Sequence, residues 1–123
     1  MMMTHFEAID QFDGRINGTS NVGVLHLSYN QMCELFGRAH AEGRFDKTST
    51  EWAFSWTNDE EDSGVFTVYD WYFVRDKDDE VVTKWSIGGH CSRDFFAVMD
   101  IVENRREDLY LDRSILSGEK LYV

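Results

Sequence analysis

The chain of 123 residues contains no proline, only two cysteines and few basic side chains. Cys33 and Cys91 form no CxxC pair, which argues against a disulfide framework or a zinc site of the usual spacing and is typical of a reducing cytoplasm. No apolar run reaches the roughly 20 residues that a membrane helix needs. The first residues also lack a basic end followed by an apolar stretch, so we expect no secretory signal. These absences predict a cytoplasmic protein with no membrane partner.

Acidic residues outnumber basic ones by 23 to 12, so the net charge is −11. Proteins bind the phosphate backbone through cations that displace counterions, and this charge balance therefore argues against direct nucleic-acid binding. The hydrophobic content of 42% and the aromatic content of 15% are too high for a disordered chain. Without repeats or Gly/Ser-rich linkers, we expect one domain over residues 1–123, with 1–21 and 105–123 as terminal extensions.

The spacing of apolar residues predicts an α+β fold. Branched residues at 22–27 are typical of a strand, and Ser28 stands where the N-cap of a helix over 28–36 belongs. From Thr50 the period changes to two, which predicts strands over 50–56, 65–74 and 81–87 with short connections. Ser92 is expected to cap a second helix. The order strand–helix–three strands–helix predicts an antiparallel sheet of three to four strands with two helices packed on it. At the N-terminus, the spacing of Phe6, Ile9 and Phe12 fits a short amphipathic turn.

The predicted strand over 65–74 is apolar on both faces. Two short helices cover one face of a sheet, so a second apolar face needs another partner. We expect one face to meet the N-terminal segment, the C-terminal tail or a second subunit in a homodimer, and its residues are Phe66, Val68, Tyr72 and Val74.

Acidic residues concentrate in the two connections that join the three consecutive strands. Successive connections of a meander lie at opposite ends of a sheet, so the acids are expected at both ends. They are either ordinary solvated turns or a surface whose charge attracts a basic protein. Trp71 and Tyr72 are candidate aromatic anchors. The expected partner-binding residues are Asp59, Glu60, Glu61, Asp62, Asp70, Trp71, Tyr72, Asp76, Asp78, Asp79 and Glu80.

Catalytic and ligand-binding motifs are sparse. Cys91 immediately precedes a helix, whose dipole would stabilise a thiolate, and His90 is adjacent, so a small enzyme using this pair is one alternative. His26 or Cys33 could complete a metal site with this pair only through the fold, and we expect no metal and no cofactor. The double glycine before the second helix is a candidate anion site, formed by Gly88, Gly89, Ser92 and Arg93.

Four segments together resemble small acidic accessory proteins encoded by bacteriophages, a group that includes anti-CRISPR and other anti-defence proteins. The segments are residues 27–37, 50–52, 68–71 and 85–90, and the likeness spans roughly residues 27–104 in spacing and composition. This resemblance implies a phage protein that acts in the cytoplasm of a bacterial host by binding something.

The leading hypothesis is therefore a non-enzymatic inhibitor that binds a basic host defence protein, with a CRISPR effector as the first candidate, through an acidic surface that mimics nucleic acid. One alternative is a protein that sequesters a nucleotide immune signal at the double glycine. The other is the small enzyme using Cys91 and His90.

Overall fold

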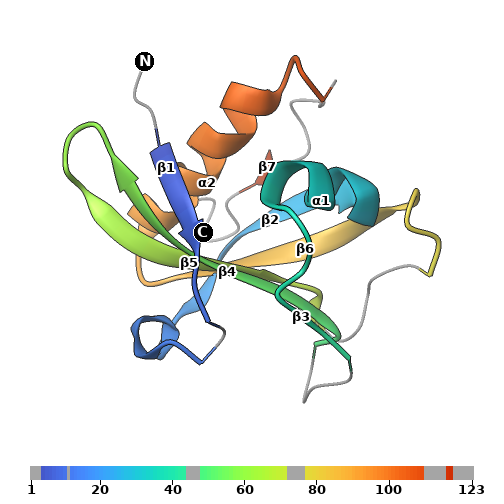
Figure 1. The fold of residues 1–123 in the computed structure, drawn as a ribbon, viewed down its shortest axis with the longest axis horizontal. Helices are drawn as coiled ribbons and strands as arrows, with labels where there is room; N and C mark the ends of the chain where they lie inside the picture. The colour runs from blue at the N-terminus through green and yellow to red at the C-terminus, as the bar shows by residue number, and fades with distance from the viewer. Residues whose placement is uncertain (1–3, 11, 44–47, 72–76, 110–115, 118–123) are drawn as a thin grey trace.

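The computed structural model describes residues 4–10, 12–43, 48–71, 77–109 and 116–117 (Figure 1). In chain order the elements are β1 (Thr4–Ala8), the short 3-10 helix η1 (Gly14–Ile16), β2 (Ser20–Ser28), α1 (Tyr29–Phe36), β3 (Ala41–Glu42), β4 (Thr50–Asn58), β5 (Ser63–Tyr69), β6 (Val82–Gly89), α2 (Ser92–Arg105) and β7 (Leu116–Ser117).

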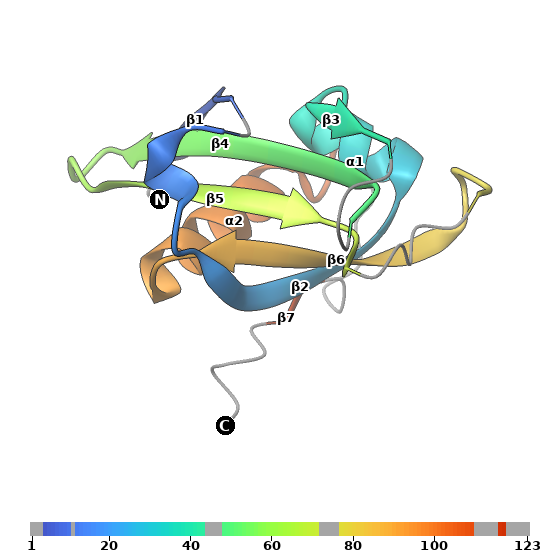
Figure 2. The same cartoon turned by 90° about the horizontal axis from the view of Figure 1, so that it is seen from below.

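The described strands form one antiparallel sheet in the order β1-β4-β5-β6-β2-β7. β3 pairs with β4 beyond the stretch that pairs with β1. Figure 2 shows β4, β5, β6 and β2 side by side, with α2 behind them. The α+β class and the antiparallel meander β4-β5-β6 are confirmed. The predicted count of three to four strands is wrong, because β1, β3 and β7 add short edge segments with little periodicity of their own.

The helix α1 begins at a local signal. The Ser28 hydroxyl accepts the backbone N–H of Gln31, and the Gln31 side chain accepts the backbone N–H of Ser28, which forms a capping box. Gly37 follows the helix with a φ of 80°, a left-handed conformation that glycine adopts without strain. The helix is thereby fixed at both ends by residues that the sequence places there.

Three tryptophans occupy the core between the sheet and the two helices. Trp52 and Trp85 meet edge to face with ring centroids 5.4 Å apart, and Trp56 lies further along β4. Each indole N–H has a partner: Trp52 donates to the carbonyl of Gly37, Trp85 to that of Leu27 and Trp56 to the Asp94 carboxylate. A buried indole needs such an acceptor, so these bonds fix the orientation of the rings.

The helices cover the sheet face that we expected to lack cover. Phe66 and Val68 are fully buried in the core cluster together with Phe36 and Val98 from the two helices. We expected the N-terminal segment, the C-terminal tail or a second subunit to cover this face. The two helices cover Phe66 and Val68 instead, and Phe6 and Leu109 pack against the same cluster, while Tyr72 and Val74 lie outside the described residues. The opposite face carries the half-exposed Thr67 and is approached by η1.

The N-terminal segment is a strand and not an amphipathic turn. Phe6 on β1 lies opposite Trp56 and packs edge to face on Phe54 at 5.2 Å. Phe12, by contrast, is 84% exposed. The apolar residues of this segment therefore do not share one buried face, and β1 closes the edge of the sheet beside β4.

Candidate functional site

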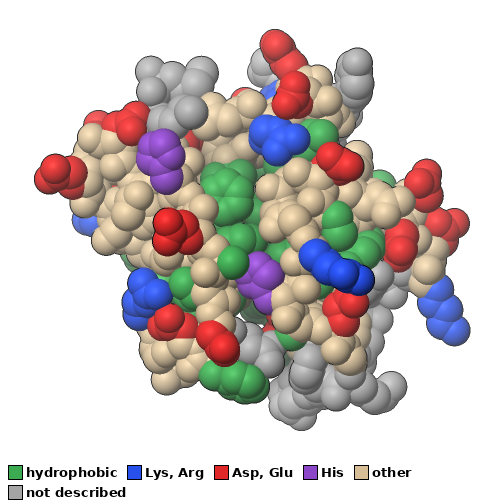
Figure 3. All heavy atoms as spheres, in the orientation of Figure 1, with side chains coloured by type: hydrophobic (Ala, Val, Ile, Leu, Met, Phe, Trp, Pro, Cys, Tyr) green, Lys and Arg blue, Asp and Glu red, His purple; other side chains and the backbone are tan. Residues whose placement is uncertain are grey.

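Exposed acids occupy both ends of the meander. Figure 3 shows acidic side chains over the β4–β5 turn at one margin of the molecule and over the connection leading into β6 at the other. Asp59, Glu60 and Glu61 are exposed at the first end, and Asp78 and Glu80 at the second. The predicted placement of the acids at opposite ends of one sheet agrees with the register of β4, β5 and β6.

The β4–β5 turn is organised by Asn58. Its side-chain oxygen accepts the backbone N–H groups of Glu60 and Asp62 at 2.9 and 3.0 Å. Glu61 has a φ of 65°, which turns the chain back toward β5. One cation reduces the charge here, because Arg93 lies 3.6 Å from Asp62, and the His5 ring lies 3.7 Å from Asp59. The turn is thus a defined acidic surface that is partly compensated.

The second acidic end is attached to α1. The side-chain amide of Asn30 donates to Glu80 at 3.0 Å, and the backbone N–H of Asn30 donates to the carbonyl of Asp79 at 3.1 Å. Asp78 accepts the backbone N–H of Glu80. Asp76 and Tyr72, the other residues expected at this end, lie outside the described residues.

Asp70 does not belong to the acidic surface. It is fully buried, and its carboxylate accepts the backbone N–H groups of Ser49 and Thr50 at 2.7 and 2.8 Å as well as the Ser49 hydroxyl. Buried carboxylates require such donors, so Asp70 holds the start of β4 against the end of β5. We therefore correct its assignment from partner binding to structure. Its neighbour Trp71 is 43% exposed and remains a candidate anchor.

Trp71 borders a hollow of about 250 Å³ on the sheet face opposite the helices. Tyr69 meets Trp71 edge to face at 6.0 Å, and His40, Thr48 and Glu51 also line the hollow. The backbone N–H of Ala53 donates to His40 Nδ1 at 2.9 Å, and burial lowers the pKa of this histidine below its ordinary value.

The double glycine leads to a site that already holds a carboxylate. Asp94 is buried in the first turn of α2, and its carboxylate accepts the backbone N–H of His90 at 2.8 Å. Gly88 and Gly89 are buried residues of β6, and a Cβ on Gly89 would lie 2.7 Å from the Cβ of Asp94. Ser92 is exposed, and Arg93 pairs with Asp62. At this junction Gly89 makes room for the chain's own anion, whereas Gly88 lies against Thr67.

Cys91 and His90 are both exposed at the same junction. Cys91 is the N-cap of α2 and makes no side-chain capping bond. His90 Nε2 lies 2.6 Å from the carbonyl oxygen of Arg15, so this nitrogen carries the proton and donates it. The ring is thereby oriented toward the η1 segment.

Metal-ligating side chains do not gather anywhere in the described parts of the chain: no group of three or more His, Cys, Asp and Glu residues could hold an ion. Within the same parts, no helix is long and apolar enough to span a membrane.

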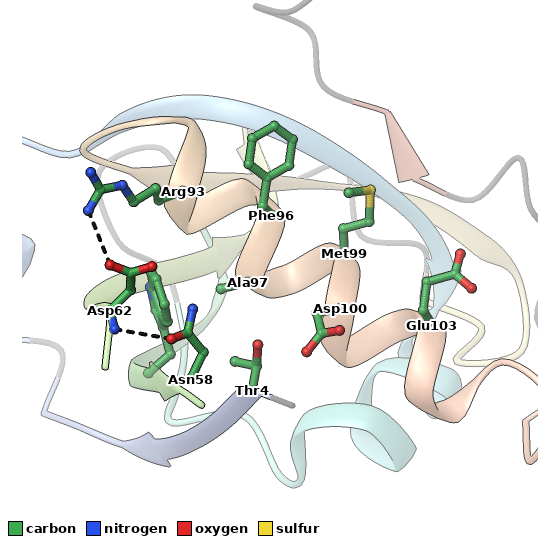
Figure 4. Close-up of a pocket in the computed structure, with 10 residues that line it drawn as sticks. Thr4, Asn58, Asp62, Arg93, Phe96, Ala97, Met99, Asp100 and Glu103 are labelled. Atoms are coloured by element: carbon green, nitrogen blue, oxygen red, sulfur yellow. Dashed lines mark hydrogen bonds and ion pairs between the residues drawn. The ribbon is translucent and has the colours of Figure 1, made fainter. Parts of the chain in front are cut away.

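A groove that the sequence interpretation missed runs between α2 and β1. Its volume is about 560 Å³, and its lining includes Thr4, Trp56, Asp62, Phe96, Met99 and Asp100 (Figure 4). Two apolar side chains of α2 that border the groove are exposed: Met99 by 37% and Phe96 by 45%. Residues 95–99 are all apolar, so they cover more of the helix circumference than one buried stripe requires. This excess was the feature of the sequence that could have indicated an exposed apolar surface on α2.

No protein-family model matches the chain, and a search of curated proteins finds no significant match. The functional interpretation therefore depends on the geometry and charge described above.

Proposed function

We propose that this protein is a non-enzymatic inhibitor that binds a basic, nucleic-acid-binding protein of a bacterial host, with a CRISPR effector as the first candidate partner. The observation that carries the proposal is that some acidic residues are buried and hydrogen-bonded, whereas others are exposed. The buried Asp70 and Asp94 are saturated with hydrogen bonds, whereas Glu60, Glu61 and Glu80 project from the two ends of the sheet.

The charge distribution supports a basic partner. A net charge of −11 on 123 residues raises the free energy of the compact state through self-repulsion. A partner groove lined by Lys and Arg relieves that repulsion and accelerates the encounter, as it does for nucleic acid. The resemblance to phage accessory proteins favours a defence protein of the bacterial host as this partner.

Charge reversal tests the proposal. The variant with Glu60→Lys, Glu61→Lys and Glu80→Lys changes three exposed acids at the two ends of the sheet. Its matched control, Glu7→Lys, Glu34→Lys and Glu107→Lys, makes the same change in net charge at exposed positions elsewhere. Binding to a panel of purified CRISPR effector complexes is measured by biolayer interferometry at about 50 and about 200 mM salt.

We expect the wild-type protein to bind one effector with an affinity that falls as salt rises, and the end-reversal variant to bind at least about tenfold more weakly. The control should lose far less affinity, and circular dichroism should show both variants folded. Equal affinity of the end-reversal and control variants would contradict a role for the two acidic ends.

A further inference from the structure

The groove between β1 and α2 has an apolar part and an acidic part, and the described residues that line it come from β1, β4, the β4–β5 turn and α2. We propose that it binds an arginine-bearing segment of the partner, with the guanidinium against Asp100 and a neighbouring apolar side chain against Phe96 and Met99. This inference rests on the proposed function, because it names the place where a basic partner docks.

Asp100 supplies the charge that selects a cation. One of its carboxylate oxygens, Oδ2, is inaccessible to solvent and has no hydrogen-bond partner. The other two carboxylates at the groove have cations beside them: Arg93 lies 3.6 Å from Asp62, and Arg106 pairs with Glu103. Among the described residues Asp100 alone of these three has no cation. The carboxylate therefore carries a charge that no described cation offsets, and a guanidinium bound in the groove would lie beside it and offset that charge.

The apolar part of the groove favours an apolar residue next to the arginine in the bound segment. Phe96 and Met99 project from the same side of α2, and Asp100 lies nearer Thr4 of β1 (Figure 4). Phe96 and Met99 are among the largest exposed apolar side chains of the described residues. An aromatic face and a thioether accept both a guanidinium stem and an apolar neighbour. The groove therefore fits a segment in which basic and apolar residues alternate.

Arginine fits this groove better than lysine for physical reasons. A guanidinium is planar, is more weakly hydrated than an ammonium and carries five donors, so it can approach a partly buried carboxylate at a smaller desolvation cost. Its stem also covers apolar surface while the charged end reaches the carboxylate. Anionic ligands are disfavoured because three carboxylates line the groove, whereas two guanidinium groups, those of Arg93 and Arg106, lie beside them.

The test uses a fluorescein-labelled synthetic peptide in which arginine alternates with leucine, followed by fluorescence anisotropy with the full chain. Asp100→Asn removes the groove charge at nearly constant volume. Glu60→Gln is the matched control, since it removes one exposed charge outside the groove. We expect about tenfold weaker binding for Asp100→Asn and less than about twofold for the control, because exposed charges contribute little individually. Replacing arginine with citrulline, which is planar and neutral, should weaken binding as much as Asp100→Asn.

Each remaining outcome separates the groove from the wider proposal. If Asp100→Asn and Glu60→Gln weaken binding equally, the groove inference is overturned and the acidic-surface function stands. If the wild-type chain binds no arginine peptide even at low salt, the groove inference is overturned, and the effector measurements described above decide the acidic-surface function. A second copy of the chain in the groove would appear in sedimentation as a dimer abolished by Phe96→Asp, and this also overturns the inference.

A further measurement remains decisive if Asp100→Asn fails to fold. The backbone amides of the wild-type protein are followed by NMR during titration with the same peptide. Shifts concentrated at Ala97 and Asp100 support the groove, whereas shifts concentrated at Glu60 and Glu61 overturn it.

Discussion

The two helices of this protein begin in opposite ways. At α1, Ser28 and Gln31 exchange hydrogen bonds of 3.1 and 2.9 Å within one turn of the chain. At α2, the N-cap Cys91 makes no side-chain bond, and the role passes to Asp94 in the first turn. The Asp94 carboxylate accepts the indole N–H of Trp56 and the backbone N–H of His90, both at 2.8 Å.

The start of α1 is determined by neighbouring residues, which is a local signal. The start of α2 is determined by a contact between residues far apart in the chain, which is a tertiary signal. The start of α1 is contained in four consecutive residues, so it forms the same bonds in any context that allows a helix. The start of α2 requires β4 to place Trp56 beside it, 38 residues away in the chain. A buried carboxylate with two charge-assisted bonds stabilises the folded state only when both donors are present. The second helix is therefore fixed to the sheet by a charge, and the first by its own sequence.

The largest expected effect comes from breaking the tertiary signal. Asp94→Ala leaves the buried indole N–H of Trp56 and the part-buried backbone N–H of His90 without an acceptor. Hydrogen bonds to a charged group contribute about 1.5–3 kcal/mol each, so we expect the free energy of unfolding to fall by about 3–4 kcal/mol in urea titrations. Asp62→Ala is the control, because its half-exposed carboxylate faces Arg93 across 3.6 Å at the surface and should cost less than about 1 kcal/mol. Comparable losses in the two variants would show that Asp94 does not fix α2.

The space around Asp94 gives the next largest effect. A Cβ on Gly64 would lie 2.3 Å from Asp94 Oδ1, and one on Gly89 would lie 2.7 Å from its Cβ. Gly64→Ala and Gly89→Ala should therefore each lower stability by about 2 kcal/mol, as overpacking does elsewhere. Gly14→Ala is the matched control, since nothing lies within 4 Å of the added carbon. Its thermal midpoint should stay close to that of the wild type, and a Gly89→Ala midpoint equally close would refute the packing argument.

The elements that the sequence predicted best are those with local signals. Ser28 at the expected N-cap position and the period of two from Thr50 placed α1 and β4 within two residues of their observed bounds. The short edge strands had no such signal. In β1, Phe6 is the only large apolar residue, and pairing with β4 completes the strand. Tertiary hydrogen bonding and not local propensity decides such segments.

The candidate site was less predictable because acidic residues that look alike in the sequence have different structural roles. Asp70 and Asp94 are buried and bonded, Glu60 and Glu61 are exposed, and no pattern of neighbouring residues distinguishes these groups. The groove at Asp100 is formed by two elements far apart in the chain, one of which, β1, lacked a strand signal. Only the three-dimensional packing shows which carboxylates are exposed.

Breaking the local signal should have a smaller effect than breaking the tertiary one. Ser28→Ala removes the acceptor for the Gln31 N–H, and we expect a loss of about 1 kcal/mol, the usual contribution of an N-cap. Ser28→Asp retains an acceptor and should recover most of that stability in the same urea titration. A loss as large as that of Asp94→Ala would contradict the contrast between the two helices.

The smallest expected effect concerns pH and the single histidine that accepts a backbone bond in the described residues. His40 Nδ1 accepts the N–H of Ala53, and its ring packs against Phe54 with centroids 4.8 Å apart. Burial lowers the pKa of His40 below the ordinary 6.5, so the folded protein resists protonation that the unfolded chain accepts. The stability from this group is complete above pH 6.5 and is lost progressively as pH falls from there through the lowered pKa of the folded state.

His40→Asn keeps an acceptor oxygen and does not titrate. Carboxylates titrate in both proteins, so the quantity to compare is the drop in thermal midpoint between about pH 7.5 and about pH 5.5. We expect the drop to be larger in the wild type than in His40→Asn, by less than the Ser28→Ala shift, and equal drops would show that His40 is protonated as easily in the folded state as in the unfolded chain.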